Sequence, residues 1–215
     1  MKINTPYFVI NVEILLLIVF LISILSEKAR FFLSSFYICY LFIVFHELSH
    51  MLVGAIVGKE FKQFNLSLSG VCVSFKDKKY NTSKETKYDL IKDIFVYIAG
   101  PLSNVIMAIL FQNIKIIFEI NIFFALLNLI PLYPLDGYNL IITIFKLIGI
   151  KDNYTKIVID IFENILLLIL TVLSLAQIVI LRNPSMVIFI IYVIIQKKQR
   201  ENSDKNAEIL RNMAY

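Results

Sequence analysis

Apolar residues occur in long runs along the chain, and these runs predict helices that cross a membrane. A helix needs about 20 apolar residues to cross roughly 30 Å of hydrocarbon. The runs predict six spans, of which the last is the shortest: residues 7–25, 33–57, 94–112, 114–131, 161–181 and 184–196. A further run at 138–150 is short and carries Lys146, so we expect an interfacial or re-entrant helix there.

The pattern changes in residues 58–93, the one sizeable hydrophilic segment between predicted spans. Apolar and polar residues alternate from Phe64 to Leu68, Ser69 and Gly70 interrupt the alternation, and apolar residues resume at Val71. This pattern predicts a small β-hairpin over residues 64–75. The lysine-rich stretch that follows, 76–92, predicts a mobile charged loop.

Composition supports a membrane protein. Of the 215 residues, 59% are hydrophobic and 17% are charged, whereas soluble domains average about 45–50% and about 25%. The expected fold class is an all-α polytopic membrane protein with about six transmembrane helices and a small membrane-associated β-hairpin. We expect a transmembrane domain over 1–196, with the hairpin and a cytosolic loop at 58–93, and a short, solvated cytosolic tail at 197–215.

The placement of basic residues predicts the orientation in the membrane. Six spans put both termini on one side, and 17 of the 21 lysines and arginines fall on that side. Basic residues accumulate on the cytosolic side of membrane proteins, so we expect both termini in the cytosol. The net charge of +5 is then explained by loops that face anionic lipid, and nucleic acid is not an expected partner.

The second predicted span contains candidate chemistry, the motif His46-Glu47-Leu48-Ser49-His50. Residues four apart lie on one helix face, so both imidazoles can point at one ion, while Glu47 can take a proton from a water. An acid near the bilayer centre costs about 2.5–3.5 kcal/mol, which favours a functional role. The alternative is that the histidines bridge helices through hydrogen bonds or are solvated near the surface.

A catalytic zinc site typically uses three protein ligands, and Asp136 is the candidate for the third. Pro131 and Pro134 interrupt the fourth span just before it, and opened backbone within a membrane must be satisfied by protein or water. The second and fourth spans run in the same direction, so both motifs are expected at similar depth. Alternatively, Asp136 caps the next helix and Gly137 is a turn residue.

Together these motifs resemble the site-2 protease family of intramembrane zinc metalloproteases, and in particular its stage IV sporulation protein FB type. The likeness covers residues 31–138 and includes the stretch 99–104 in the third span. It implies one zinc ion per chain held by His46, His50 and Asp136, with Glu47 activating water. The resemblance also implies residues that shape the site or place the substrate, namely Asn104, Asn128 and Pro134.

The resemblance implies hydrolysis of a peptide bond in or near the membrane segment of a substrate protein. The expected substrate is a membrane-associated or single-span protein, with a membrane-tethered sigma factor precursor as one candidate, and the expected partners include the lipid bilayer and membrane regulatory proteins. The expected location is a bacterial inner or plasma membrane, or the forespore membrane. Sporulation proteases usually carry a C-terminal CBS domain that this sequence lacks, and Tyr138-Asn139 stands where many relatives have Gly-Arg.

Two other functional classes remain open at this point. One is a catalytically inactive relative that binds membrane substrates, although the complete motif argues against it. The other is a metal or ion transporter, which would need polar groups along several spans. Three acids near the ends of predicted spans are expected to be solvated: Glu13, Glu119 and Glu163.

Overall fold

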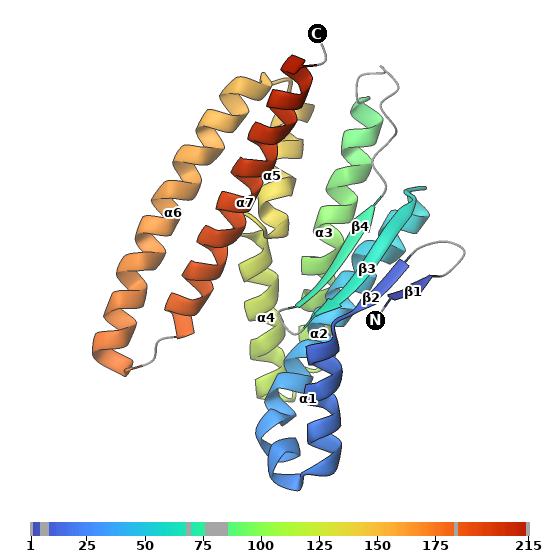
Figure 1. Ribbon diagram of the computed structural model, residues 1–215, viewed down its shortest axis with the longest axis vertical. Helices are drawn as coiled ribbons and strands as arrows, with labels where there is room; N and C mark the ends of the chain where they lie inside the picture. The colour runs from blue at the N-terminus through green and yellow to red at the C-terminus, as the bar shows by residue number, and fades with distance from the viewer. Residues whose placement is uncertain (1, 5–8, 68–69, 76–85, 183–184, 214–215) are drawn as a thin grey trace. The chain divides into compact units, whose positions relative to one another are not determined.

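The computed structural model describes residues 2–4, 9–67, 70–75, 86–182 and 185–213 (Figure 1). This described part is mostly helical, with seven helices and one four-stranded sheet. The chain divides into two compact units, Met1–Leu127 (unit 1) and Asn128–Tyr215 (unit 2). The elements are β1 (Lys2–Asn4), β2 (Val9–Val12), α1 (Ile14–Leu25), α2 (Glu27–Ile56), β3 (Phe61–Ser67), β4 (Gly70–Phe75), α3 (Lys87–Leu110), α4 (Lys115–Leu129), α5 (Asp136–Leu147), α6 (Asp152–Leu181) and α7 (Ser185–Met213).

Unit 1 contains the sheet, whose strands follow the order β1-β2-β3-β4. The predicted hairpin is present as β3 and β4, which pair antiparallel with Phe64 opposite Val73. The hairpin begins earlier than predicted, at Phe61, and two residues of its expected turn, 68–69, lie outside the described residues. β4 is an edge strand, so only one of its sides is paired within the sheet.

The first predicted span, 7–25, is wrong in its N-terminal half. Val9–Val12 forms β2, which pairs parallel with β3, and the helix begins only at Ile14. Val and Ile are good strand formers, and Asn11 donates a 2.8 Å side-chain hydrogen bond to Asn65 of β3. The sheet pairing of this apolar stretch therefore outweighs the expectation of a continuous helix.

Two long helices, α2 and α3, lie side by side in unit 1 (Figure 1). The end of α2 is joined to α3 by an ion pair between Lys59 and Asp93. α3 begins with a capping box in which Thr86 and Asp89 exchange hydrogen bonds of 3.2 and 3.3 Å. The helix thus begins at Lys87, within the predicted charged loop, and residues 76–85 of that loop lie outside the described residues.

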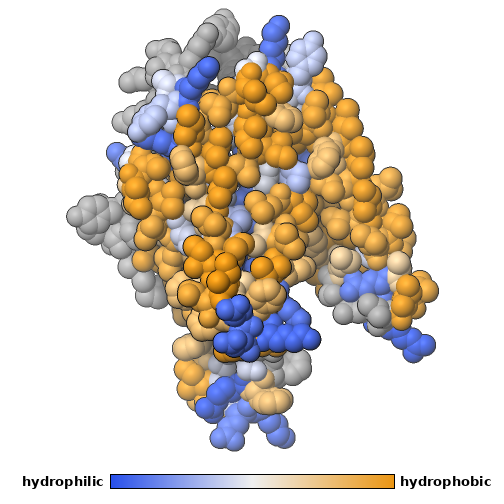
Figure 2. Space-filling view, turned by 180° about the vertical axis from the view of Figure 1, so that it is seen from behind, coloured by the Kyte–Doolittle hydropathy of each residue, from blue (hydrophilic) through white to orange (hydrophobic). Residues whose placement is uncertain are grey.

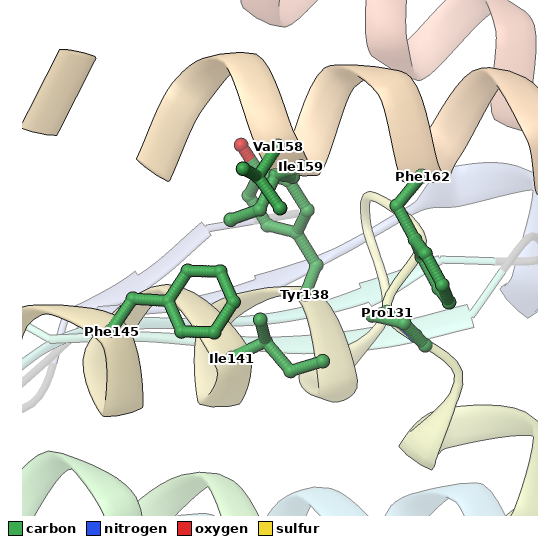
Figure 3. Close-up of a pocket in the computed structure, with 7 residues that line it drawn as sticks. All are labelled: Pro131, Tyr138, Ile141, Phe145, Val158, Ile159 and Phe162. Carbon is green, nitrogen blue, oxygen red and sulfur yellow. The ribbon is translucent and has the colours of Figure 1, made fainter. Parts of the chain in front are cut away.

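Unit 2 contains α5, α6 and α7, with α5 packed against α6 and α6 against α7. The short run at 138–150 is helical, as predicted, and is part of α5. A cavity of about 140 Å³ lies between α5 and α6 (Figure 3), and its lining is apolar apart from the Tyr138 hydroxyl. The predicted tail continues α7 to Met213, and its Lys197 and Arg200 side chains are each only 13% exposed rather than solvated.

Three helices among the described residues are long and apolar enough to cross a membrane: Phe36–Ile56, Lys87–Leu110 and Tyr154–Ile180. α1 and α4 have 12 and 15 residues, or about 18 and 22 Å, which is shorter than the hydrocarbon layer. Six spans are therefore not confirmed. Large apolar side chains are exposed along the helices, as the orange surface in Figure 2 illustrates, and these features indicate a membrane protein.

Candidate metal centre

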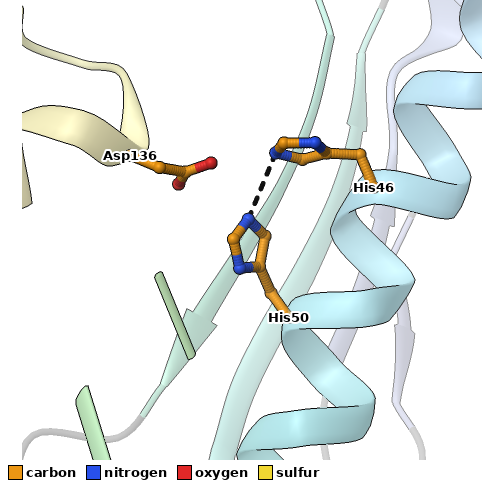
Figure 4. Close-up of side chains that lie close together, drawn as sticks. All are labelled: His46, His50 and Asp136. Atoms are coloured by element: carbon orange, nitrogen blue, oxygen red, sulfur yellow. Dashed lines mark hydrogen bonds between the residues drawn. The ribbon is translucent and has the colours of Figure 1, made fainter. Parts of the chain in front are cut away.

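The two histidines of the motif lie one helical turn apart on α2, and both side chains are 5% exposed. Their Nε2 atoms face each other at 3.2 Å (Figure 4). We call His46 and His50 the histidine pair. The helical spacing that the sequence predicts therefore brings both imidazoles to one point on the buried face of α2.

Hydrogen bonds to α3 determine which nitrogen of each imidazole carries the proton. His46 Nδ1 lies 2.7 Å from Asn104 Oδ1, and His50 Nδ1 lies 2.6 Å from the Val96 carbonyl oxygen. Both oxygens are acceptors, so each Nδ1–H donates and each neutral ring has a lone pair at Nε2. Two lone pairs 3.2 Å apart repel each other unless a proton or a cation lies between or beside them.

The spacing of the two Nε2 atoms fits a zinc ion. Zn–N bonds of about 2.0–2.1 Å in a tetrahedral site separate two nitrogens by about 3.3–3.4 Å, close to the observed 3.2 Å. Gly100 of α3 provides the space, because a Cβ there would collide with Nε2 of both His46 and His50. The alternative of simple helix bridging accounts for the Nδ1 bonds but not for this convergence.

A series of hydrogen bonds through two buried amides, Asn104 and Asn121, leads to His46 of the histidine pair. Asn104, which the sequence analysis places in the site, is 1% exposed and donates through Nδ2 to Asn121 Oδ1 at 3.3 Å. Asn121 is 0% exposed and donates in turn to the Ile117 carbonyl oxygen at 2.9 Å. This order fixes Oδ1 of Asn104 toward His46. Sequence reasoning missed Asn121, although an Asn in the middle of the apolar run of α4 is a usable signal.

Glu47 lies against the edge strand of the sheet. Its Oε2 atom accepts a 3.1 Å hydrogen bond from the backbone N–H of Val73 in β4. A charge-assisted bond of this kind holds a carboxylate firmly. The sequence predicts both the hairpin and Glu47, but not that the strand touches the carboxylate, because this contact depends on tertiary packing.

In unit 2, Asp136 is the first residue of α5. The N-cap position belongs to Leu135, whose side chain has no acceptor, so Asp136 is not the capping residue. Gly137 is buried, and a Cβ there would collide with the backbone carbonyl oxygens of Leu129 and Ile130. We call residues 130–136 the Asp136 loop. Its path depends on glycine because the end of α4 passes directly over the start of α5.

The remaining predicted site residues lie beside or within this loop. Asn128 is the next-to-last residue of α4, and its side chain is half-buried. Pro134 follows a cis peptide bond from Tyr133. His46 and His50 of unit 1 and Asp136 of unit 2 are candidate metal ligands in the described part of the chain, and Figure 4 draws these three side chains.

Glu163 corrects a prediction, because it is not solvated. Its side chain is 0% exposed, and its Oε1 accepts a 2.9 Å hydrogen bond from the backbone N–H of Tyr133 in the Asp136 loop. Arg200 and Lys197 of α7 lie beside the carboxylate and supply positive charge. The sequence did not reveal this arrangement, because its members lie far apart along the chain.

Comparisons with known proteins concern the fold. No protein-family model matches the sequence, and no curated protein matches it. The chain is similar to a solved structure, the site-2 protease from Methanocaldococcus jannaschii, with a TM-score of 0.63 and 18% sequence identity. The likeness covers 93% of this chain and 94% of that chain. The chain therefore shares the fold of that site-2 protease, and this is the fold family that the resemblance of its motifs implies.

Proposed function

We propose that the protein is an intramembrane zinc metalloprotease of the site-2 protease family. The observation that carries the proposal is the histidine pair, whose Nδ1 atoms are both committed to acceptors and whose Nε2 atoms converge at 3.2 Å. Glu47 belongs to the same helical turn, where a general base is needed. The shared fold supports the family assignment.

Asp136 is the third ligand in this proposal. Two imidazole nitrogens and one carboxylate oxygen are a donor set that suits catalytic zinc and leaves a fourth position open. A bound zinc ion would lower the pKa of water to about 7 and polarise a peptide carbonyl. The chain's own residues would hold the ion and keep bulk water from the buried imidazoles.

Glu47 acts as the general acid and base. Its carboxylate takes a proton from the attacking water and later delivers it to the leaving amine. The Val73 N–H fixes one carboxylate oxygen at 3.1 Å and so limits rotation of the side chain. This restriction keeps the base in one orientation.

The substrate is a membrane-associated or single-span protein, and a membrane-tethered sigma factor precursor is one candidate. A helical substrate must unwind before cleavage because its carbonyls are hydrogen-bonded. The edge strand β4 is a suitable surface for an unwound segment, which would add as a further strand. Since β4 also contacts Glu47, an added strand would lie near the base. Both termini are proposed to lie in the cytosol.

The test is Glu47→Gln in purified protein and in co-expression with candidate precursors. Zinc content should stay at one per chain while cleavage is lost, whereas His46→Ala should lose both zinc and cleavage. Glu119→Gln is the matched control, because Glu119 is exposed on α4 and its ion pair with Lys115 spans 3.7 Å. Full cleavage by Glu47→Gln would overturn the assigned role, and zinc-free wild type would overturn the enzyme class.

A further inference from the structure

The Asp136 loop is attached to α6 through its backbone. The N–H of Tyr133, three residues before Asp136, donates to Glu163 Oε1 at 2.9 Å. A carboxylate with no exposed surface is costly unless its charge is compensated by hydrogen bonds and cations. A buried acid at this place therefore needs an explanation beyond packing, and its contact with the loop backbone supplies one.

The compensation comes from α7. Arg200 donates from both terminal nitrogens to the two oxygens of Glu163, at 3.3 and 3.0 Å, in the bidentate geometry of strong ion pairs. Lys197 lies 3.5 Å from Glu163 and donates to Asn164 at 2.8 Å. Asp160 contacts Arg200 at 3.5 Å and is more exposed. We call these residues, Glu163, Arg200, Lys197 and Asp160, the Glu163 cluster.

Arg200 also packs on the loop directly. Its guanidinium carbon lies 5.0 Å from the centre of the Tyr133 ring and 4.7 Å from that of Tyr138, and the two rings meet edge to face. Arg200 thus neutralises the acid that holds the loop backbone, and it also stacks on one aromatic ring before Asp136 and one after it.

The guanidinium of Arg200 keeps its positive charge throughout the physiological pH range. Burial by itself lowers the pKa of Arg200, but its hydrogen bond to Glu163 and the charges of Glu163 and Asp160 outweigh burial and raise that pKa above its usual range. A raised pKa means that the stabilisation is present at all lower pH values and is lost only as the pH rises past it. Arg200 is therefore a constant positive charge beside Glu163 at physiological pH.

We propose that Glu163, oriented by Arg200, is a positioning residue that holds the Asp136 loop so that its carboxylate is ready to bind the metal. The inference rests on the proposed function in one respect, the ligand role of Asp136. It assigns a purpose to α6 and α7 that the motifs do not suggest, because α6 and α7 contain none of the motif residues.

Two double variants separate positioning from simple packing. Both replace the buried ion pair with residues that carry no charge, which often preserves stability. In Glu163→Gln/Arg200→Met the Gln oxygen can still accept from the Tyr133 N–H, whereas in Glu163→Leu/Arg200→Met nothing at that position can. Asp160→Asn, which alters the exposed partner of Arg200, is the control within the cluster.

Two readouts are measured on each purified protein. The first is amide hydrogen exchange of a peptide covering residues 129–138 in metal-free protein, and the second is zinc affinity by competition with a chromophoric chelator. We expect the Leu variant to exchange faster in this peptide and to bind zinc about 10–100-fold more weakly. The Gln variant and Asp160→Asn should stay close to wild type in both measurements.

The outcomes distinguish the two proposals. Unchanged exchange in the Leu variant would show that Glu163 does not hold the loop, and faster exchange with unchanged zinc affinity would show that the loop needs no positioning. If the Gln and Leu variants lose exchange protection and zinc affinity equally, the hydrogen bond to Tyr133 is not the cause, and the effect comes from removing the ion pair. If wild type binds no zinc while exchange behaves as expected, the zinc function is wrong and the attachment of the loop to Glu163 stands.

Discussion

The two candidate ligand regions are held in different ways. In unit 1, the histidine pair is held by neutral groups, the Asn104 amide and the Val96 carbonyl, in a space opened by Gly100. In unit 2, the Asp136 loop is held by the hydrogen bond from the Tyr133 N–H to Glu163, whose buried charge Arg200 compensates. Neutral acceptors at Nδ1 leave the Nε2 lone pairs of the imidazoles available to a cation, whereas a loop without helical hydrogen bonds needs a stronger attachment at its backbone.

The two regions also differ in what a Cβ added at a glycine would meet. At the histidine pair the close neighbours of Gly100 are two side chains, whereas the close neighbour of Gly137, directly after the Asp136 loop, is backbone. Side chains can swing away from an added atom, but backbone carbonyls of a helix end cannot. The same substitution should therefore affect metal binding in unit 1 and folding stability in unit 2.

Gly100→Ala is expected to have the largest effect on metal binding. Its Cβ would enter the space of both Nε2 atoms and turn the imidazoles away. Altering a residue that hydrogen-bonds to a metal ligand typically lowers metal affinity by about 10–100-fold. Displacing the ligands themselves should therefore lower zinc affinity by more than about 100-fold. Chelator competition on purified protein measures this change. Ala is about 1 kcal/mol more favourable than Gly within a helix, and this gain partly offsets the steric cost to the unfolding free energy of the metal-free protein.

The control for this substitution is Gly54→Ala, on α2 in the same unit 1. There an added Cβ would meet the Phe75 ring and not the imidazoles, so zinc affinity should stay near that of wild type. Normal zinc affinity in Gly100→Ala would mean that the histidines can bind the ion from other rotamers, and the proposed lone-pair geometry would be wrong.

Asn104→Ala is expected to have the next largest effect. It removes the acceptor for His46 Nδ1–H, so the ring can rotate or change tautomer, and zinc affinity should fall about 10–100-fold. Asn121→Ala removes only the partner of the Asn104 amide, and a smaller loss is expected. Titration with zinc and a competing chelator ranks the two variants, and equal losses would contradict a chain that acts through Asn104.

Sequence alone was sufficient for the histidine pair because helical periodicity acts over four residues. The hairpin was also predicted, since alternation and a turn signal are local features. The spacing of His46 and His50 and the position of Glu47 between them follow from the helix itself. No tertiary information is needed to place three side chains of one helical turn on neighbouring faces.

The features that were missed depend on contacts between distant residues. β2 lies in an apolar run that suits either a helix or a strand, and its pairing with β3 decides between them. Glu163 has an ordinary position near a predicted span end, yet its partners Tyr133 and Arg200 are 30 and 37 residues away. Burial of a charge depends on the partners that fold around it, so residue type and hydropathy cannot reveal it.

Gly137→Ala should affect stability more than metal chemistry. An added Cβ would collide with the Leu129 and Ile130 carbonyl oxygens, and overpacking of this kind typically costs about 1–3 kcal/mol. Chemical unfolding of metal-free protein in detergent measures the loss, and hydrogen exchange locates it to residues 129–138. A variant as stable as wild type, in contrast to a Gly100→Ala protein that loses zinc, would remove the proposed distinction between the two regions.

The smallest expected effect concerns how unit 1 aligns a substrate beside the histidine pair. Because the Val73 N–H points to Glu47, the alternating antiparallel pattern places the backbone groups of Val71 and Phe75 on the same outer edge of β4. An added substrate strand would use every second amide, so N-methylation of successive substrate amides should raise KM with a period of two. Each lost hydrogen bond is worth about 0.5–1.5 kcal/mol, or roughly a 2- to 10-fold rise in KM with little change in kcat. A KM that does not alternate along the substrate would exclude strand addition to β4 and leave unit 1 to act in cleavage through the histidine pair and Glu47.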